Sequence, residues 1–225
     1  YGISREDQDQ MSLESHQRSR AAIAAGTLKD EIVPVSLPQR RGDPIVFDTD
    51  ERPMETTIEK MARLKPFFKK DGTVTAGNAS GINDGAAAIV LASADAAEKA
   101  GAKPKARVLG YAHAGVRPEV MGIGPVPAVQ NLLERTGLSV DDFDVIESNE
   151  AFAAQALAVT KELGFDNERV NPNGGAIALG HPVGATGAII TLKALYELER
   201  TGGKRALITM CIGGGQGIAL AFERL

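Results

Sequence analysis

Two glycine-rich loops in the later part of the sequence carry side chains suited to acid–base chemistry. His181 lies in NPNGGAIALGHPVGATG (residues 171–187), and Cys211, the only cysteine, begins CIGGGQG (residues 211–217). Glycine lets the backbone turn sharply and approach a ligand closely. An imidazole and a thiol in such loops could move protons on a carbonyl compound, while backbone N–H groups stabilise negative charge on its oxygen.

Each of these residues also has a structural alternative. A single cysteine is more often a small core residue than a catalyst, and a histidine beside glycine and proline is often only a loop residue. The presence of both in glycine loops flanked by regular elements favours the catalytic interpretation. Neither loop is a nucleotide-binding fingerprint, because residues 180–187 lack the Lys-Ser/Thr of a P-loop and the cysteine loop leads into a predicted strand.

Composition bounds the class of protein. The 225 residues are 43% hydrophobic, enough for a sizeable core, and the net charge is -4 with Lys and Arg scattered along the chain. This argues against nucleic acid or a membrane surface as a partner. The single cysteine excludes an internal disulfide and favours the cytoplasm.

Metal binding is not expected, because His16, His113 and His181 are far apart in the sequence and Cys211 has no near partner. The sequence also begins with Tyr1 rather than methionine. We therefore expect it to be part of a longer protein.

The first third of the sequence predicts a helix followed by an irregular arm. Ser4 is a plausible N-cap and Gly26 a plausible stop for a helix between them, whose polarity suggests a peripheral position. Residues 28–75 contain five prolines among short apolar runs and many charges. This pattern is typical of strands, turns and short helices in a loop subdomain.

The remaining sequence alternates apolar runs with amphipathic stretches, as expected of an α/β domain. The expected order is a strand at 86–92, a helix at 95–100, a strand at 106–112, a helix at 126–135, a strand at 143–148 and a helix at 150–163. Asn149 then follows a strand end, where ligands collect in α/β sheets. Its structural alternative is to cap the next helix.

The helix after the His181 loop is expected on the surface. Ala188, Leu192 and Leu195 share one face, and Lys193, Glu197 and Arg200 share another. A strand at 205–210 should end at Cys211, turn through the glycines and pair with an antiparallel strand at 218–222.

Four motifs resemble, in order and spacing, the C-terminal half of the thiolases, a family of acetyl-CoA acetyltransferases and β-ketothiolases. They are TAGNASGINDGAAA (75–88), SNEAFAAQ (148–155), NPNGGAIALGHPVGATGA (171–188) and CIGGGQG (211–217). The resemblance implies an α/β fold: a layered α/β/α core domain at 81–225, with a mixed five-stranded sheet and helices on both faces. It also implies part of a loop domain at 1–80. Ketoacyl synthases are disfavoured because they carry no cysteine at the Cys211 position.

The resemblance implies roles for the loop residues. His181 would take the proton of a nucleophilic cysteine, which belongs to an N-terminal half that the motifs do not cover, because attack requires a thiolate. Cys211 would remove and return a proton at the α-carbon of acetyl-CoA, with nearby N–H groups bringing its pKa toward the working pH. His181 and a water held by Asn149 would form one oxyanion hole, and the Gly213 N–H would contribute to a second.

The resemblance further implies coenzyme A or acetyl-CoA as substrate, with no permanently bound cofactor. Positions that would contact the pantetheine arm or wall the acyl pocket are Ser80, Ala76, Ala151, Phe152 and Met121. Arg52 would meet the nucleotide phosphates, although residues 50–60 depart from the family pattern by about one residue. The expected partners are acyl-CoA, the N-terminal half and further copies in a homodimer or homotetramer. The alternative function is a non-catalytic CoA-binding or assembly module.

Overall fold

The helix α1 (Arg5–Ala25) begins and ends where the sequence predicts, in a computed structural model that describes residues 1–225. The Ser4 hydroxyl accepts from the Asp7 N–H, and the Asp7 carboxylate accepts from the Ser4 N–H. Gly26 ends the helix with a φ of 74°, a left-handed conformation that glycine adopts without strain. Local capping chemistry therefore determines both boundaries.

The expected peripheral position of α1 holds for only one side of the helix, because Gln10 and Gln17 are exposed whereas its other face buries polar side chains. Ser15 is buried on the side of α1 that packs against α5 (Ala153–Leu163) and α6 (Ala176–Leu179), and His16 is buried beside the arm, where it accepts from the Met54 N–H at 3.3 Å. A buried hydroxyl needs a hydrogen-bond partner, and Ser15 donates to Glu150 with an Oγ–Oε2 distance of 2.7 Å. The helix is polar because the surface that it covers is polar.

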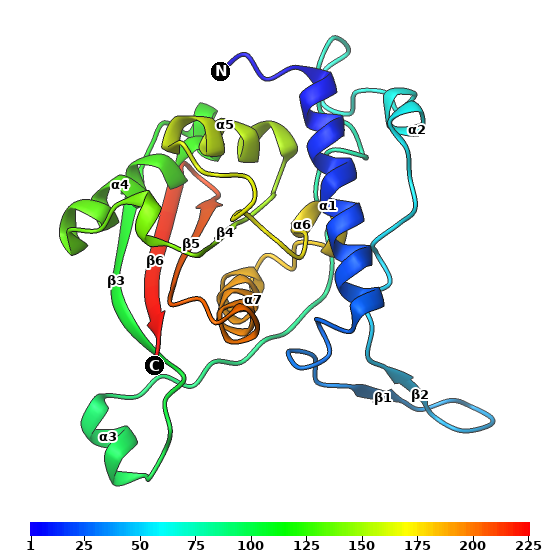
Figure 1. The fold of residues 1–225 in the computed structure, drawn as a ribbon. Coiled ribbons are helices and arrows are strands. Elements are labelled where there is room, and N and C mark those ends of the chain that lie inside the picture. Colours follow the sequence, from blue (N-terminus) through cyan, green and yellow to red (C-terminus); the bar gives the residue numbers. More distant parts are fainter.

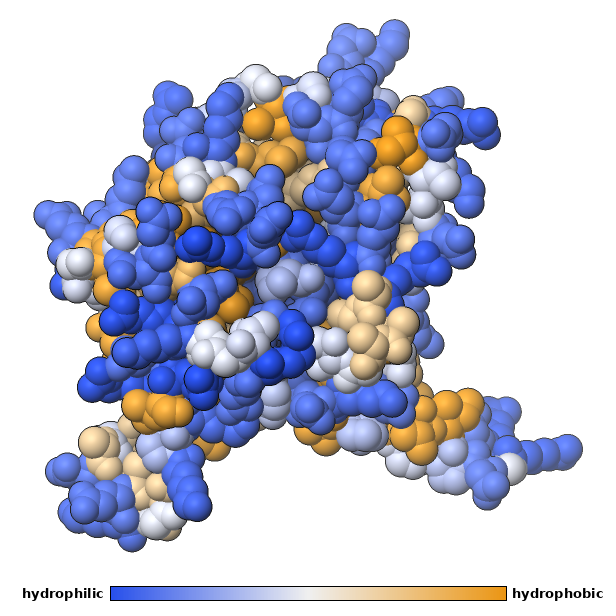
Figure 2. Space-filling model, in the orientation of Figure 1, coloured by the Kyte–Doolittle hydropathy of each residue, from blue (hydrophilic) through white to orange (hydrophobic).

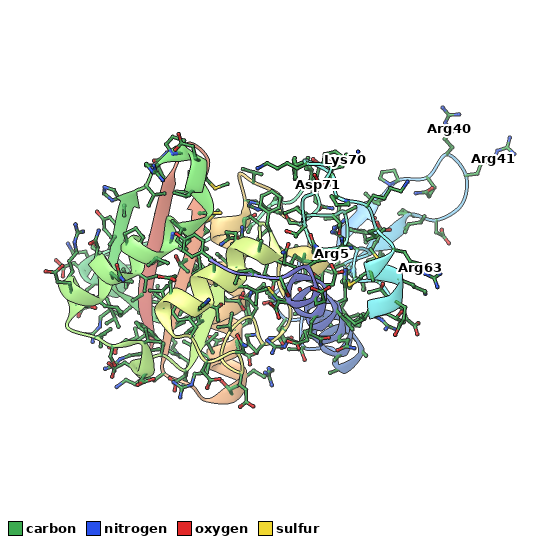
Figure 3. All side chains as sticks on the ribbon, turned by 90° about the horizontal axis from the view of Figure 1, so that it is seen from above. Arg5, Arg40, Arg41, Arg63, Lys70 and Asp71 are labelled. Atoms are coloured by element: carbon green, nitrogen blue, oxygen red, sulfur yellow. The ribbon has the colours of Figure 1, made fainter.

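Residues 28–75 form the expected arm of short elements. β1 (Val35–Leu37) and β2 (Ile45–Phe47) pair as an antiparallel hairpin, and α2 (Ile58–Ala62) follows. The hairpin projects from the body with Arg40 and Arg41 at its tip (Figures 1 and 3). Its strands expose apolar side chains, which are visible in the space-filling view (Figure 2).

The sheet is mixed, as expected, but it has four strands rather than five. Their order is β3 (Ala106–Gly115), β6 (Gln216–Arg224), β5 (Arg205–Ile212) and β4 (Val145–Ser148). β6 is antiparallel to both of its neighbours, and β4 is parallel to β5. The predicted hairpin through the cysteine loop and the strand before Asn149 are therefore confirmed.

A side chain extends the β4 edge where a fifth strand is absent. Val170 makes a single parallel bridge to Ile146, and the chain then turns at Asn171, which has a φ of 46°. The Asn171 Oδ1 accepts from the Ser148 N–H at 2.9 Å, and its Nδ2 donates to the Ser148 carbonyl at 2.8 Å. The turn stops the strand, and the amide supplies the next pair of ladder hydrogen bonds.

The predicted strand at 86–92 is wrong. These residues form no regular element, and Val90 and Leu91 are 94% and 80% exposed. A strand requires a hydrogen-bonded neighbour, and no strand of this chain lies beside the segment. The segment is therefore a connection to α3 (Ala94–Lys99), and the sheet begins at β3.

Helices cover both faces of the sheet, as expected (Figure 1). One face packs against α4 (Pro125–Thr136) and α5, with the 3₁₀ turns η1 (Pro118–Ile123) and η2 (Val140–Asp142) at its margins. The other face packs against α7 (Thr186–Thr201). The first core includes Leu132, Phe143, Ile146, Val159 and Leu207, and the second includes Val145, Ile190, Leu198, Ile208 and Phe222.

The assignment of a surface face to α7 is wrong for Lys193 and Glu197, although Arg200 is exposed as expected. Lys193 and Glu197 are buried, whereas Ala188, Leu192 and Leu195 are only half-buried. The buried Glu197 carboxylate is paired, because Asn173 donates to its Oε2 at 2.7 Å and the Arg200 Nε donates to the same oxygen at 3.1 Å. Charged spacing on a helix cannot distinguish solvent from a polar neighbour.

The Glu150 carboxylate joins separate segments behind the sheet edge. It accepts from the Ser15 hydroxyl, from the Asn171 Nδ2 at 3.0 Å and from the Ile177 N–H at 3.2 Å. Burial raises the pKa of Glu150, and these donors oppose that shift. Gly175 lies against the carboxylate, so a Cβ atom at this position would overlap it.

Glu147 is a second buried acid, on the face of β4 that α7 covers. It is 1% exposed, and its Oε1 has no hydrogen-bond partner among protein groups. Burial raises the pKa of Glu147 to about 8, although the positive charge of Lys193 opposes the shift. Glu147 is therefore largely uncharged at neutral pH.

Replacing Gly175 with alanine tests the contact with Glu150. Because the added methyl group would displace the carboxylate from its donors, we expect Gly175→Ala to lower the free energy of unfolding by about 2 kcal/mol or more. Urea unfolding measures the change. The control is Gly184→Ala, since no atom lies within 4 Å of a Cβ at Gly184. Equal midpoints for the two variants would contradict the assignment.

The pKa of Glu147 predicts a pH dependence of stability. Its folded-state pKa of about 8 lies above the ordinary value of 4.5, so its contribution is fully present below about pH 4.5 and is lost as the pH rises through about 8. Between about pH 5 and pH 9, we expect Glu147→Gln to lose less stability than the parent, by on the order of 3 kcal/mol. Urea titrations measure this, with the exposed Glu162→Gln as control. If the parent and Glu147→Gln lost the same free energy of unfolding over this pH range, the raised pKa of Glu147 would be refuted.

Candidate active site

Asn149 lies at the end of β4, in the position expected of a ligand-facing residue. Its N–H donates to the Thr209 carbonyl of β5 at 3.0 Å, and its side chain is almost fully buried. α5 begins only at Ala153, with Phe152 at its N-cap. The alternative role of Asn149 as a helix cap is therefore excluded.

The loop before α7 brings His181 to Asn149. The Asn149 Nδ2 lies 3.4 Å from the His181 Nε2, and the His181 Nδ1 lies 2.7 Å from the Thr186 Oγ1. The His181 N–H donates to the Gly81 carbonyl at 3.0 Å. This contact ties the 75–85 motif to the histidine loop. Partial burial lowers the pKa of His181, so the imidazole is neutral near pH 7.

Cys211 lies at the same edge of the sheet, near the end of β5. Ser148 pairs with Thr209 in the parallel register, and Cys211 follows Thr209 by two residues. The thiol forms no disulfide, is 6% exposed and makes no hydrogen bond with His181 or Asn149. Burial raises the pKa of Cys211, which corrects the expectation that nearby N–H groups would bring it toward neutrality.

Gly213 begins the turn between β5 and β6. Its carbonyl accepts from the Gln216 Nε2 at 3.2 Å. No heavy atom lies within 4 Å of a Cβ built at this position, whereas one at Gly215 would overlap the Val116 carbonyl. The space beside Gly213 is therefore open.

The motif at 75–85 meets the motif at 148–155 directly. The Ser80 N–H donates to the Ala151 carbonyl at 3.1 Å, and the Ala153 N–H donates to the Asn78 carbonyl at 2.9 Å. Phe152 packs edge-on against Phe68, with ring centroids 6.1 Å apart. Ser80, Ala151 and Phe152 thus lie together.

The remaining predicted residues lie around this contact. Ala76 is exposed, and Met121 is half-buried in η1, which contacts α5. The Arg52 guanidinium packs against Gly81, and its Nη2 donates to the Ile177 carbonyl at 3.3 Å. Arg52 therefore joins the arm to α6.

Three residues that support the site were not predicted as such. Thr186 contacts the His181 imidazole, Asn171 holds the Ser148 backbone and Glu150 connects the strand end to α1. Their only sequence signal is a polar residue inside a motif, which does not identify a partner. For Ser15 and Glu150 the two residues are 135 positions apart.

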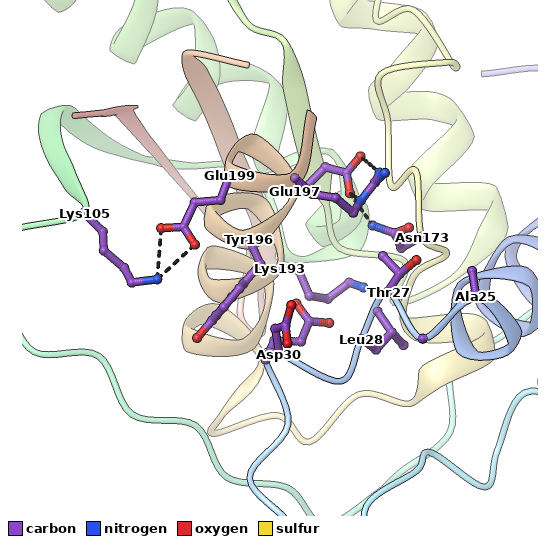
Figure 4. Close-up of a pocket in the computed structure, with 13 residues that line it drawn as sticks. Ala25, Thr27, Leu28, Asp30, Lys105, Asn173, Lys193, Tyr196, Glu197 and Glu199 are labelled. Atoms are coloured by element: carbon purple, nitrogen blue, oxygen red, sulfur yellow. Dashed lines mark hydrogen bonds and ion pairs between the residues drawn. The ribbon is translucent and has the colours of Figure 1, made fainter. Parts of the chain in front are cut away.

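Two cavities flank α7. One of about 30 Å³ lies behind Asn149 and Thr186 and also touches Glu147 and Lys193. The other, of about 630 Å³, is lined by charged and polar residues of the second half of α7 and by the segment after α1 (Figure 4). Within it, the Lys105 Nζ donates to both carboxylate oxygens of Glu199 at 2.9 Å. The larger cavity is separate from the predicted chemistry, because none of the predicted catalytic residues lines it.

No group of three or more His, Cys, Asp or Glu side chains is arranged to hold a metal ion. None of the helices combines the length and apolar character needed to cross a membrane.

Known proteins match the whole chain. The chain is 62% identical over 227 residues to the β-ketothiolase BktB of Cupriavidus necator, covering all of the chain and 57% of that relative. The crystal structure of the Bacillus anthracis acetyl-CoA acetyltransferase superimposes with a TM-score of 0.97 at 51% identity, covering 100% of this chain and 57% of that one. For human mitochondrial 3-ketoacyl-CoA thiolase in complex with CoA, the TM-score is 0.90 at 45% identity, over 99% of this chain and 55% of that one.

The chain thus spans a little over half the length of these relatives. Two family descriptions match successive parts of it. "Thiolase, N-terminal domain" matches residues 1–95, and "Thiolase, C-terminal domain" matches residues 102–224. Together with the fold and the motifs, these matches show that the chain belongs to the thiolase family.

Proposed function

We propose that this chain is the part of a thiolase that supplies a histidine, an acid–base cysteine and an asparagine-held water. The reaction is the reversible Claisen condensation of acetyl-CoA and its reverse, CoA-dependent thiolysis of a 3-ketoacyl-CoA. The nucleophilic cysteine would come from the remainder of the protein, so this chain alone would be inactive. The observation that carries the proposal is the contact of Asn149 with His181 at the sheet edge that also holds Cys211.

His181 is proposed as the base that prepares the nucleophile. A thiol with an ordinary pKa of about 8.5 is mostly protonated at neutral pH, and only its thiolate attacks a thioester efficiently. The lowered pKa of His181 supports this role, because the imidazole is then neutral and able to accept the proton.

Cys211 is proposed as the group that handles the α-proton. In condensation, its thiolate takes a proton from the methyl carbon of acetyl-CoA, and the resulting carbanion forms a C–C bond with the acyl group on the nucleophilic cysteine, whose sulfur leaves. In thiolysis, the Cys211 thiol returns that proton. The raised pKa supports the donor role, because the resting group is a thiol rather than a free thiolate.

The enolate oxygen requires hydrogen-bond donors. We assign the first oxyanion hole to the protonated His181 Nε2 and a water on Asn149, and part of the second to the Gly213 N–H. The Asn149 Oδ1 has no partner among protein groups, which supports a role in holding water. The open space beside Gly213 supports approach of an acyl group.

Coenzyme A is the proposed substrate carrier, because a homologous thiolase has been crystallised in complex with CoA. Ser80 and Ala76 would contact the pantetheine arm, and Ala151, Phe152 and Met121 would wall the acyl pocket. The direct contact of Ser80 with Ala151 supports this arrangement. One N–H of the Arg52 guanidinium donates to the Ile177 carbonyl, so its remaining N–H groups would make the proposed contact with the nucleotide phosphates.

We also propose a division of the chain into two domains and an oligomeric state for the whole protein. Residues 1–80 would belong to the loop domain and residues 81–225 to the core domain, and the whole protein would be a cytoplasmic homodimer or homotetramer. The exposed apolar hairpin β1–β2 supports a role in assembly. The alternative is a CoA-binding or assembly module without catalysis, which would bind CoA but exchange no protons.

The proposed role of Cys211 predicts separate effects on the two half-reactions. The test uses a protein that joins this chain to the nucleophile-bearing remainder of a thiolase. We expect Cys211→Ala to lower deuterium exchange at the methyl carbon of acetyl-CoA by at least about a hundredfold, because the proton acceptor is lost. Acylation of the nucleophile should remain largely intact, as measured by mass spectrometry.

The control is Ile212→Val, one residue further along β5, which should retain exchange. Normal exchange in Cys211→Ala would refute the role of Cys211. A parent protein that binds CoA but shows neither exchange nor acylation would favour the non-catalytic module.

A further inference from the structure

The Thr186 hydroxyl lies between the His181 imidazole and a backbone carbonyl. Thr186 is the first residue of α7 and is 2% exposed. Its Oγ1 lies 2.7 Å from the His181 Nδ1 and 2.9 Å from the Pro182 carbonyl oxygen. Both distances are those of well-formed hydrogen bonds.

The chemistry of these groups determines the direction of each bond. A hydroxyl has one hydrogen, and a carbonyl oxygen can only accept. Both contacts can be hydrogen bonds at the same time only if the Thr186 hydroxyl donates to the Pro182 carbonyl, as the structure has it, and its oxygen accepts from the Nδ1–H of His181. In the neutral imidazole, this leaves the lone pair on Nε2.

The opposite side of the ring accommodates the same tautomer. The Asn149 Nδ2 lies 3.4 Å from the His181 Nε2, and an amide nitrogen is only a donor. In the amide orientation of the structure, Asn149 thus faces the lone pair of Nε2, which is compatible with the tautomer that the Thr186 contacts select.

The backbone fixes the position of this hydroxyl. The N–H groups of Ala185 and Thr186 donate to the Pro182 carbonyl at 2.8 and 2.9 Å, which places Thr186 one turn from the histidine. On the other side of the loop, the His181 N–H donates to Gly81 at 3.0 Å. The imidazole and the hydroxyl therefore face each other without rearrangement.

We propose that Thr186 is a positioning residue that holds neutral His181 as the Nδ1–H tautomer, so that Nε2 is the atom that accepts a proton. The identity of the proton donor, the nucleophilic cysteine, rests on the proposed function. The tautomer itself does not, because it follows from contacts within this chain.

Nitrogen NMR of the ¹⁵N-labelled chain tests the tautomer without catalysis. Long-range ¹H–¹⁵N spectra distinguish a protonated from an unprotonated ring nitrogen, and the chain has only three histidines. A His181→Ala sample identifies the His181 signals. At a pH above the histidine pKa, we expect the parent to carry its proton on Nδ1. A spectrum of the unmodified chain that places the His181 proton on Nε2 would by itself overturn the proposal.

Variants then identify Thr186 as the cause. Thr186→Val keeps the shape of the side chain but removes the oxygen, and we expect the ratio of Nδ1–H to Nε2–H to fall by about tenfold, the effect of one hydrogen bond. Thr186→Ser should restore the parent ratio. The control is Thr191→Val, which removes a hydroxyl that donates to Gly187 at 2.7 Å on the same helix but does not contact the histidine.

An unchanged ratio in a folded Thr186→Val chain would refute the role of Thr186. If that variant does not fold, the parent and Thr186→Ser spectra remain decisive, because both must show Nδ1–H. In a protein that also supplies the nucleophile, Thr186→Val should lower the rate of acylation about tenfold, with rescue by serine. A shifted ratio with an unchanged acylation rate would leave the tautomer assignment intact and refute His181 as the base.

Discussion

The buried carboxylate of Glu150 is the constraint on which the rest of the structure depends. A buried charge is costly unless donors surround it, and Glu150 obtains donors from Ser15 of α1, from Asn171 and from the Ile177 N–H of α6. Because Asn149 precedes Glu150 directly, the same bonds hold the amide that faces His181. The helix α1, the sheet edge and the histidine loop are therefore stabilised together.

Burial gives the two acid–base groups uncharged resting forms. It lowers the pKa of His181 and raises that of Cys211, so that the imidazole and the thiol are both neutral near pH 7. A neutral imidazole can accept a proton and a neutral thiol can donate one. Enclosure is therefore compatible with the base role proposed for His181 and with the proton-returning step proposed for Cys211.

Helices and turns that are marked by capping residues or glycines in the sequence were predicted well. The Ser4 and Gly26 caps predicted α1, and the glycines after Cys211 predicted the β5–β6 turn. The segment at 86–92 was predicted wrongly because an apolar run shows strand propensity but not whether a neighbouring strand exists. Lys193 and Glu197 were misplaced for a similar reason, since charge spacing does not reveal a polar partner.

The sequence by itself determined the family, the main helices and strands, and the residue types at the site, because motifs and caps are local features. Only the tertiary structure decided that Asn149 meets His181, that Thr186 contacts the imidazole and that α1 buries a polar face. These include contacts between segments up to 160 residues apart, and they depend on packing and on the pairing of buried polar groups. Local propensity carries no information about either.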